Sequence, residues 1–68
     1  MSMATECFDG LGHTGYNNFE QFESRAHALG CWASKEEFHG QLYHDFEFDD
    51  GSKVTWRVNL QTGDYSAS

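Results

Sequence analysis

Acidic side chains recur at every second position in one stretch of the chain. Asp45, Glu47 and Asp49 alternate with Phe46 and Phe48. In a β-strand, alternate residues point to the same side and lie ~6.7 Å apart, which is close to the separation of neighbouring phosphates along one nucleic-acid strand. A row of carboxylates at this spacing can imitate phosphates and bind the Lys and Arg side chains of a partner.

The candidate partner-binding set extends beyond this row. Two acids precede it, another follows it in a turn, and a tyrosine would supply aromatic contact area beside the carboxylates. The complete set is Glu36, Glu37, Tyr43, Asp45, Glu47, Asp49 and Asp50. Lys53 and Arg57 are expected on the same polar face, where they would neutralise part of its charge. The alternative is that the acids only solvate the surface, since charged strands and turns also discourage pairing between molecules.

Histidine and cysteine could together hold a metal. The potential ligands are Cys7, His13, His27, Cys31, His39 and His44. Four nitrogen and sulfur ligands would suit structural zinc, and His27 and Cys31 have the spacing of one helical face. However, no short pair of the C-x2-C or H-x3-H kind recurs, so a zinc-stapled module ranks third among the hypotheses and no metal is predicted. A calcium loop starting at Asp45 is rejected, because its sixth and twelfth positions hold Asp50 and Trp56 instead of Gly and Glu.

Enzyme chemistry finds little support in the sequence. Gly10, Gly12 and Gly15 have the spacing of a dinucleotide-binding loop, but the chain has no room for the second βαβ unit. The adjacent acids at 36–37 and 49–50 are ordinary for a helix cap and a turn. A chain this short also leaves little room for a pocket that excludes water. We therefore expect a non-catalytic protein without a cofactor.

The whole chain is short and acidic. It has 68 residues, with 4 Lys and Arg against 11 Asp and Glu, which gives a formal net charge of −7 at pH 7. Such a charge repels nucleic acid and anionic membranes and attracts basic protein surfaces. Residues 1–10 do not resemble a secretory signal, and no apolar run approaches ~18 residues. We therefore expect a cytoplasmic protein that contacts neither nucleic acid nor membrane directly.

Helices are expected in the first part of the chain, after a short strand at Thr5–Phe8. Asn17 or Asn18 can cap a helix, and an apolar face with spacings of three and four residues follows until Gly30 ends it. That face comprises Phe19, Phe22, Ala26 and Leu29. The S-x-x-E pattern at the start of residues 34–40 predicts a second, short helix.

Two runs of alternating apolar residues predict a hairpin in the C-terminal third. The runs are Leu42, His44, Phe46 and Phe48, and Val54, Trp56, Val58 and Leu60. A three-residue loop at Asp49–Gly51 pairs position 46 with 54 and position 44 with 56. This register keeps the apolar faces together and puts Gly in the left-handed position of the loop. It also predicts two pairs on the polar face, Glu47 with Lys53 and Tyr43 with Arg57.

These patterns together predict a single α+β domain over residues 1–68. Its small antiparallel sheet would combine the hairpin with short strands at the N-terminus and near Tyr65. One or two helices would pack on the apolar face of that sheet.

A short segment of the chain also resembles a known family. Ala33-Ser34-Lys35-Glu36, followed by Phe38-His39-Gly40 and a hairpin, is similar to a segment of small phage-encoded anti-CRISPR proteins that act on type I CRISPR surveillance complexes. Size and the order of a helix followed by a hairpin are similar as well. Only Ser34, Lys35, Glu36 and His39 carry over from this resemblance. The present chain departs from the similar family member in being markedly acidic.

The resemblance implies an inhibitor that works in the cytoplasm of the bacterial host. Its acids would occupy a basic groove on a Cas subunit and block target DNA binding, as an acidic DNA mimic in a monomer or homodimer. The alternative is a small structural or accessory domain that contacts one partner, or a second copy, through an apolar patch.

Overall fold

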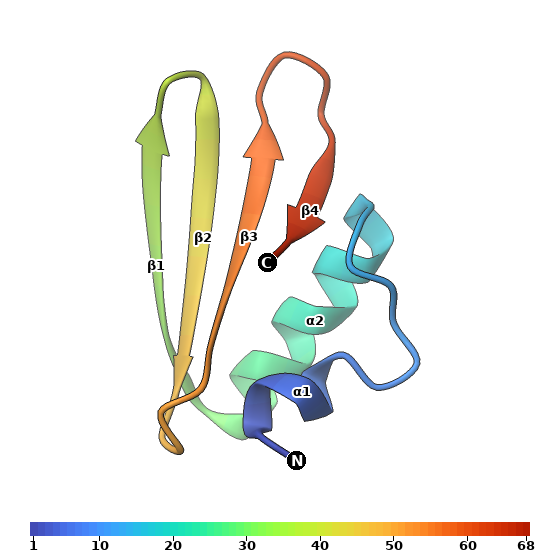
Figure 1. Cartoon of the computed structure of the whole chain (residues 1–68), viewed down its shortest axis with the longest axis vertical. Helices are drawn as coiled ribbons and strands as arrows, with labels where there is room; N and C mark the ends of the chain where they lie inside the picture. Colours follow the sequence, from blue (N-terminus) through green and yellow to red (C-terminus); the bar gives the residue numbers. More distant parts are fainter.

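The computed structural model describes residues 1–68, which form two helices and four strands (Figure 1). Their bounds are α1 Met3–Cys7, α2 Tyr16–Leu29, β1 Cys31–Phe38, β2 Gln41–Phe48, β3 Lys53–Asn59 and β4 Tyr65–Ala67. The strands form one antiparallel sheet in the order β1-β2-β3-β4. This arrangement confirms the predicted α+β class and the short strand at Tyr65.

Helix α2 forms where the apolar spacing predicted it. Phe19, Phe22 and Ala26 are buried, and Gly30 ends the helix with a φ of 86°. The N-cap differs from the prediction, because Gly15 occupies that position and neither asparagine does. The predicted apolar face was also too long, since Leu29 lies in the last turn and is exposed.

The predicted N-terminal strand is wrong, because this segment forms the short helix α1. Ser2 caps it by accepting a hydrogen bond from the Thr5 backbone N–H at 3.1 Å. Ala4 and Cys7 are three residues apart and both buried, which is the spacing of one helical face. Residues 3–7 therefore form a helix, although neither a period-two alternation nor a helical spacing extends far enough in the sequence to predict one.

The predicted second helix is also wrong, because residues 31–38 form strand β1. The S-x-x-E capping pattern is local, whereas β1 pairs with β2 along its whole length, from Cys31 opposite Phe48 to Phe38 opposite Gln41. His39 and Gly40 have φ values of 51° and 75°. Two successive residues with positive φ form the tight turn that joins antiparallel strands, so the turn directs this segment into the sheet.

The hairpin of β2 and β3 has the predicted register. Phe46 lies opposite Val54 and His44 lies opposite Trp56. Gly51 has a φ of 85° in the three-residue loop, as the bulged loop requires. One apolar position was misassigned, because Leu60 lies past the end of β3 and is exposed.

One hydrophobic core joins the helices to the sheet. Its buried members are Ala4, Cys7, Phe19, Phe22, Ala26, Phe46, Phe48, Val54 and Trp56. The Trp56 ring lies 5.5 Å from that of Phe19 and 5.7 Å from that of Phe22, measured between centroids. The helices therefore cover the sheet face that carries the aromatic and apolar side chains of β2 and β3.

The two edges of the sheet differ. At the β4 edge, the Gly15 N–H donates to the Tyr65 carbonyl at 2.9 Å, and the Ala67 N–H donates to the His13 carbonyl at 2.7 Å. The loop before α2 thus covers this edge. At the other edge, β1 has β2 as its only neighbour in the sheet (Figure 1).

Candidate partner-binding face

The sheet has a second face, which the helices do not cover. We call it the open face, and strand register assigns to it alternate residues from all four strands. Its members are Trp32, Ser34, Glu36, Phe38, Gln41, Tyr43, Asp45, Glu47, Lys53, Thr55, Arg57, Asn59 and Ser66. None of them is buried, whereas the buried residues of β2 and β3 all belong to the opposite face.

The predicted acidic row lies on this open face. Asp45 and Glu47 project from β2, and Asp45 accepts a hydrogen bond from the Thr55 hydroxyl at 2.6 Å. That bond fixes the direction of the Asp45 carboxylate. Glu47 is exposed and lies between Trp32 on one side and Lys53 on the other.

The next row of the open face mixes charge with an aromatic ring. Glu36, Tyr43 and Arg57 lie side by side on β1, β2 and β3. The Tyr43 hydroxyl donates to the Gln41 side chain at 3.2 Å, which orients the ring. Because Arg57 and Lys53 share this face with three acids, its negative charge is concentrated toward β1 and β2.

The remaining predicted residues lie elsewhere. Glu37 points to the opposite face of β1, because successive residues of a strand alternate. Asp49 is exposed in the loop between β2 and β3. The structure therefore brings four members of the predicted set together on the open face: Glu36, Tyr43, Asp45 and Glu47.

Asp50 has a structural role in the same loop. Its carboxylate accepts hydrogen bonds from the Met3 N–H at 2.7 Å and from the Ser52 N–H at 3.0 Å. It also accepts one from the Ser52 hydroxyl, and these bonds, led by the hydroxyl, lower the pKa of Asp50 below its usual value. Asp50 thus ties the N-terminus of α1 to the hairpin, and its oxygens are already engaged.

Sequence reasoning missed the most exposed aromatic residue of the open face. Trp32 is 77% exposed on β1, and Phe38, at the other end of the same strand, is 57% exposed. Neither face of β1 is covered, so its sequence lacks the apolar alternation that marks a half-buried strand. The alternating Trp32, Ser34, Glu36 and Phe38 would have been the only signal.

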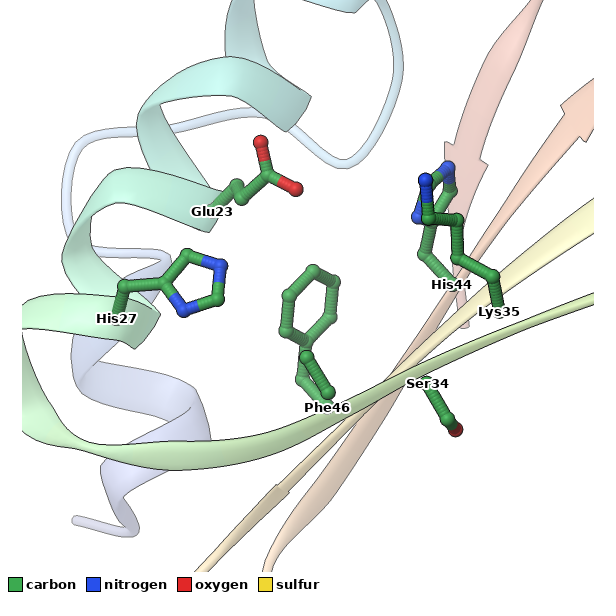
Figure 2. A pocket seen from close by; sticks show the side chains of 7 residues that line it. Glu23, His27, Ser34, Lys35, His44 and Phe46 are labelled. Atoms are coloured by element: carbon green, nitrogen blue, oxygen red, sulfur yellow. The ribbon is translucent and has the colours of Figure 1, made fainter.

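A shallow groove lies on the other side of the sheet, between α2 and β1. In Figure 2, Glu23 and His27 from α2 face Lys35 and His44 from the sheet, while Ser34 points away. The groove has a volume of about 260 Å³, below the ~300–1,000 Å³ of typical ligand pockets. Burial lowers the pKa of His44 below its usual value of 6.5, so its ring is neutral at physiological pH.

The histidine and cysteine side chains do not come together as a metal site. No group of three or more His, Cys, Asp or Glu side chains is placed to hold a metal ion. The helical spacing of His27 and Cys31 does not apply, because α2 ends at Leu29 and Cys31 begins β1. Cys7 and Cys31 are free thiols, and burial raises the pKa of each. Neither helix is long and apolar enough to cross a membrane.

The chain matches no protein-family model, and searches of curated proteins and of solved structures found no significant match.

Proposed function

We propose that this chain is a non-catalytic binding protein that docks the open face of its sheet onto a basic surface of a protein partner. The observation that carries the proposal is the position of Trp32. This side chain is 77% exposed and lies directly beside Glu47. Exposed tryptophan is costly to hydrate and is enriched among the residues that dominate binding energy at protein interfaces.

The charges of the open face define the partner. Glu36, Asp45 and Glu47 present carboxylates around Trp32 and Tyr43, and the whole chain carries a net charge of −7. A carboxylate that becomes buried at an interface needs an Arg or Lys partner, because an unpaired one costs several kcal/mol. Long-range attraction would mainly speed association and make it sensitive to salt.

The resemblance of residues 33–40 to small anti-CRISPR proteins supplies a specific partner. These residues form most of β1 and its turn into β2, next to the acids that β2 carries on the open face. The proposed partner is therefore a Cas subunit of a type I surveillance complex, in the cytoplasm of a bacterial host. By occupying Lys and Arg side chains that bind phosphates, the protein would prevent target DNA from binding.

An order-of-addition experiment tests this function. The tagged protein is incubated with a purified type I surveillance complex, either before or after target DNA is added, and bound material is recovered at salt concentrations up to roughly 0.5 M. The proposal expects recovery with the free complex, loss of recovery when DNA is already bound, and weakening as salt rises. Recovery that is equal with and without DNA would contradict competition for the DNA path. Absence of recovery at every salt concentration would contradict this choice of partner.

A second candidate function is favoured by the exposure of Trp32 and Phe38. According to this second candidate, the chain is an accessory domain that binds a protein partner through these apolar side chains, and its acids only solvate the surface. Trp32→Ala would then abolish binding, whereas Asp45→Lys with Glu47→Lys would leave binding intact. The first proposal expects the acid reversals to abolish binding as well.

A further inference from the structure

Strand β1 carries an unpaired edge. Seven of its eight residues are exposed, whereas β2 and β3 each contain buried residues. The opposite edge of the sheet is covered by the loop at His13 and Gly15. The backbone of β1 is therefore available to a further strand, and an unpaired edge is a template for another chain.

The turn geometry shows which backbone groups point outward. The two-residue turn at His39 and Gly40 is closed by a hydrogen-bonded pair, Phe38 with Gln41. Hydrogen-bonded and non-hydrogen-bonded pairs then alternate along an antiparallel ladder. Consistently, the Phe48 N–H, at the far end of β2, donates to Ser52 on the other side, at 2.9 Å. The residues with outward N–H and C=O groups are therefore Cys31, Ala33, Lys35 and Glu37.

We infer that β1 pairs with β1 of a second copy of this chain, antiparallel, with the two-fold axis at Lys35. In this register Lys35 lies opposite Lys35 of the second copy, and Ala33 lies opposite Glu37. On the open face, Trp32 lies opposite Phe38 of the second copy. The two sheets join into one, and the same patch serves both copies, as a two-fold interface requires.

Aromatic pairing on the open face favours this occupant. Trp32 and Phe38 stand at opposite ends of β1 on the same face, so a two-fold axis midway between them brings each against the other. The pair forms twice and covers the two most exposed aromatic side chains of the sheet. Directly opposed aromatic side chains each contribute favourably to strand pairing.

On the helix-side face, this register sets the two Lys35 side chains directly opposite each other, which is unfavourable, and makes Glu37 of the second copy the diagonal neighbour of each lysine, which offsets that repulsion. The choice of register therefore rests on the aromatic pairs and not on charge. Moving Lys35 opposite Ala33 would instead put Trp32 opposite Glu36. Moving it opposite Glu37 would put Trp32 opposite Gly40 and Phe38 opposite Ser34, so both aromatic pairs would be lost.

This dimer and the proposed partner both use Trp32, which in the dimer lies beside Phe38 of the second copy on the open face. The dimer would extend the open face across the axis and place an acidic row on each half. Failure of the surveillance-complex experiment leaves it standing, because its test is the oligomeric state of the isolated chain.

The first test is sedimentation from roughly 1 to 500 µM, since dimer populations depend on concentration. We expect the mass to rise from the 7.8 kDa monomer toward twice that value.

Lys35→Pro removes an outward N–H without removing a bond to β2, because edge strands accept proline at such positions. This variant should keep the chain monomeric. Lys35→Thr is the matched control, since it loses the same charge but keeps the N–H and should still dimerise.

Tryptophan fluorescence and cross-linking test the register. Trp56 is buried and Trp32 is exposed, so a red shift of the fluorescence on dilution reports that Trp32 leaves the interface. Trp32→Phe should abolish this shift.

Lys35→Cys should form a disulfide-linked dimer, because opposed Cα atoms ~5.5 Å apart suit a disulfide. Ala33→Cys alone and Glu37→Cys alone should not cross-link.

The inference would be overturned by a monomer across the whole concentration range, by equal dimerisation of Lys35→Pro and the parent, or by cross-linking of Ala33→Cys or Glu37→Cys in preference to Lys35→Cys. A chain that stays monomeric while β1 takes up an extended peptide would overturn it as well, because the edge would then serve a different occupant.

Discussion

His44 lies where the hydrophobic core meets the groove beneath β1. Its ring centroid is 4.8 Å from that of Phe19, and Trp56 lies opposite it in the sheet. Burial is the main cause of its lowered pKa, and Lys35 lowers it further, whereas Glu23 and Asp45 act in the opposite direction. The neutral ring is therefore the form that the fold accommodates.

This environment makes stability depend on pH. Below the ordinary value of 6.5, the unfolded chain binds a proton at His44 more readily than the folded chain. The stabilising contribution of the neutral ring is complete above that value and is lost as pH falls through the folded pKa. We expect His44→Leu to flatten the pH dependence of the free energy of unfolding in this range, as measured by urea denaturation.

The control for this prediction is the exposed histidine on the opposite wall of the groove. His27→Leu removes an exposed imidazole from α2, so it separates the loss of His44 from a general effect of adding leucine to this groove. If the free energies of unfolding of His44→Leu and His27→Leu change with pH in the same way, burial of His44 is not what couples protonation to folding.

At the scale of elements, the turn between β1 and β2 decides the path of a segment that local patterns assign to a helix. His39 adopts a φ of 51° and is the only non-glycine residue with positive φ. Asparagine tolerates this conformation better, and Asn-Gly is the favoured pair for such turns. We expect His39→Asn to raise the free energy of unfolding by up to about 1 kcal/mol.

Gly40 provides the opposite substitution in the same turn. It has a φ of 75° and open space where a Cβ would lie, so Gly40→Ala tests backbone strain alone and should lower stability. Thermal unfolding of both variants measures the two effects. A destabilised His39→Asn would show that the imidazole makes a contact that outweighs its backbone strain.

The same elements show how far sequence reasoning reaches. Helix α2 and the β2–β3 hairpin were predicted because each buries one face, and burial imposes a period on the sequence. Strand β1 was missed because neither of its faces is covered, so only its pairing with β2 defines it. Helix α1 is too short for its buried residues, Ala4 and Cys7, to establish a period.

The candidate site was predicted in part for the same reason. Asp45 and Glu47 share a strand whose alternation is clear, so their common face could be read from the sequence. Trp32 could not be placed beside Glu47, because that contact depends on β1 being a strand. The role of Asp50 depends on the position of Met3, 47 residues away, which no local pattern encodes.

At the scale of the whole molecule, stability depends on one small core. A chain of this length has a free energy of unfolding of about 3–10 kcal/mol. Trp56 is fully buried at the centre of that core, and its indole N–H has no hydrogen-bond partner. Trp56 therefore stabilises the fold through packing and burial of its ring, and the cost of the unsatisfied indole N–H reduces this stabilisation.

Substitutions of the two tryptophans distinguish an effect on folding from an effect on binding. Trp56→Ala should cost about 3–5 kcal/mol and unfold a large fraction of the molecules. Trp32→Ala should change stability by no more than about 0.5 kcal/mol, because Trp32 lies outside the core. Urea denaturation followed by circular dichroism at low micromolar concentration measures both. Equal losses would mean that Trp32 supports the monomer fold and is not kept for binding.

A charge-reversal comparison tests whether the acids of the open face contact a basic partner. Binding of a purified type I surveillance complex is measured by calorimetric titration for the parent, for Asp45→Lys with Glu47→Lys, and for Glu6→Lys with Glu20→Lys. Both variants change the net charge equally, but Glu6 and Glu20 are exposed on the helices. We expect that only the open-face variant abolishes binding while its circular dichroism stays native. Binding that survives this reversal, or is lost equally in both variants, would contradict this expectation.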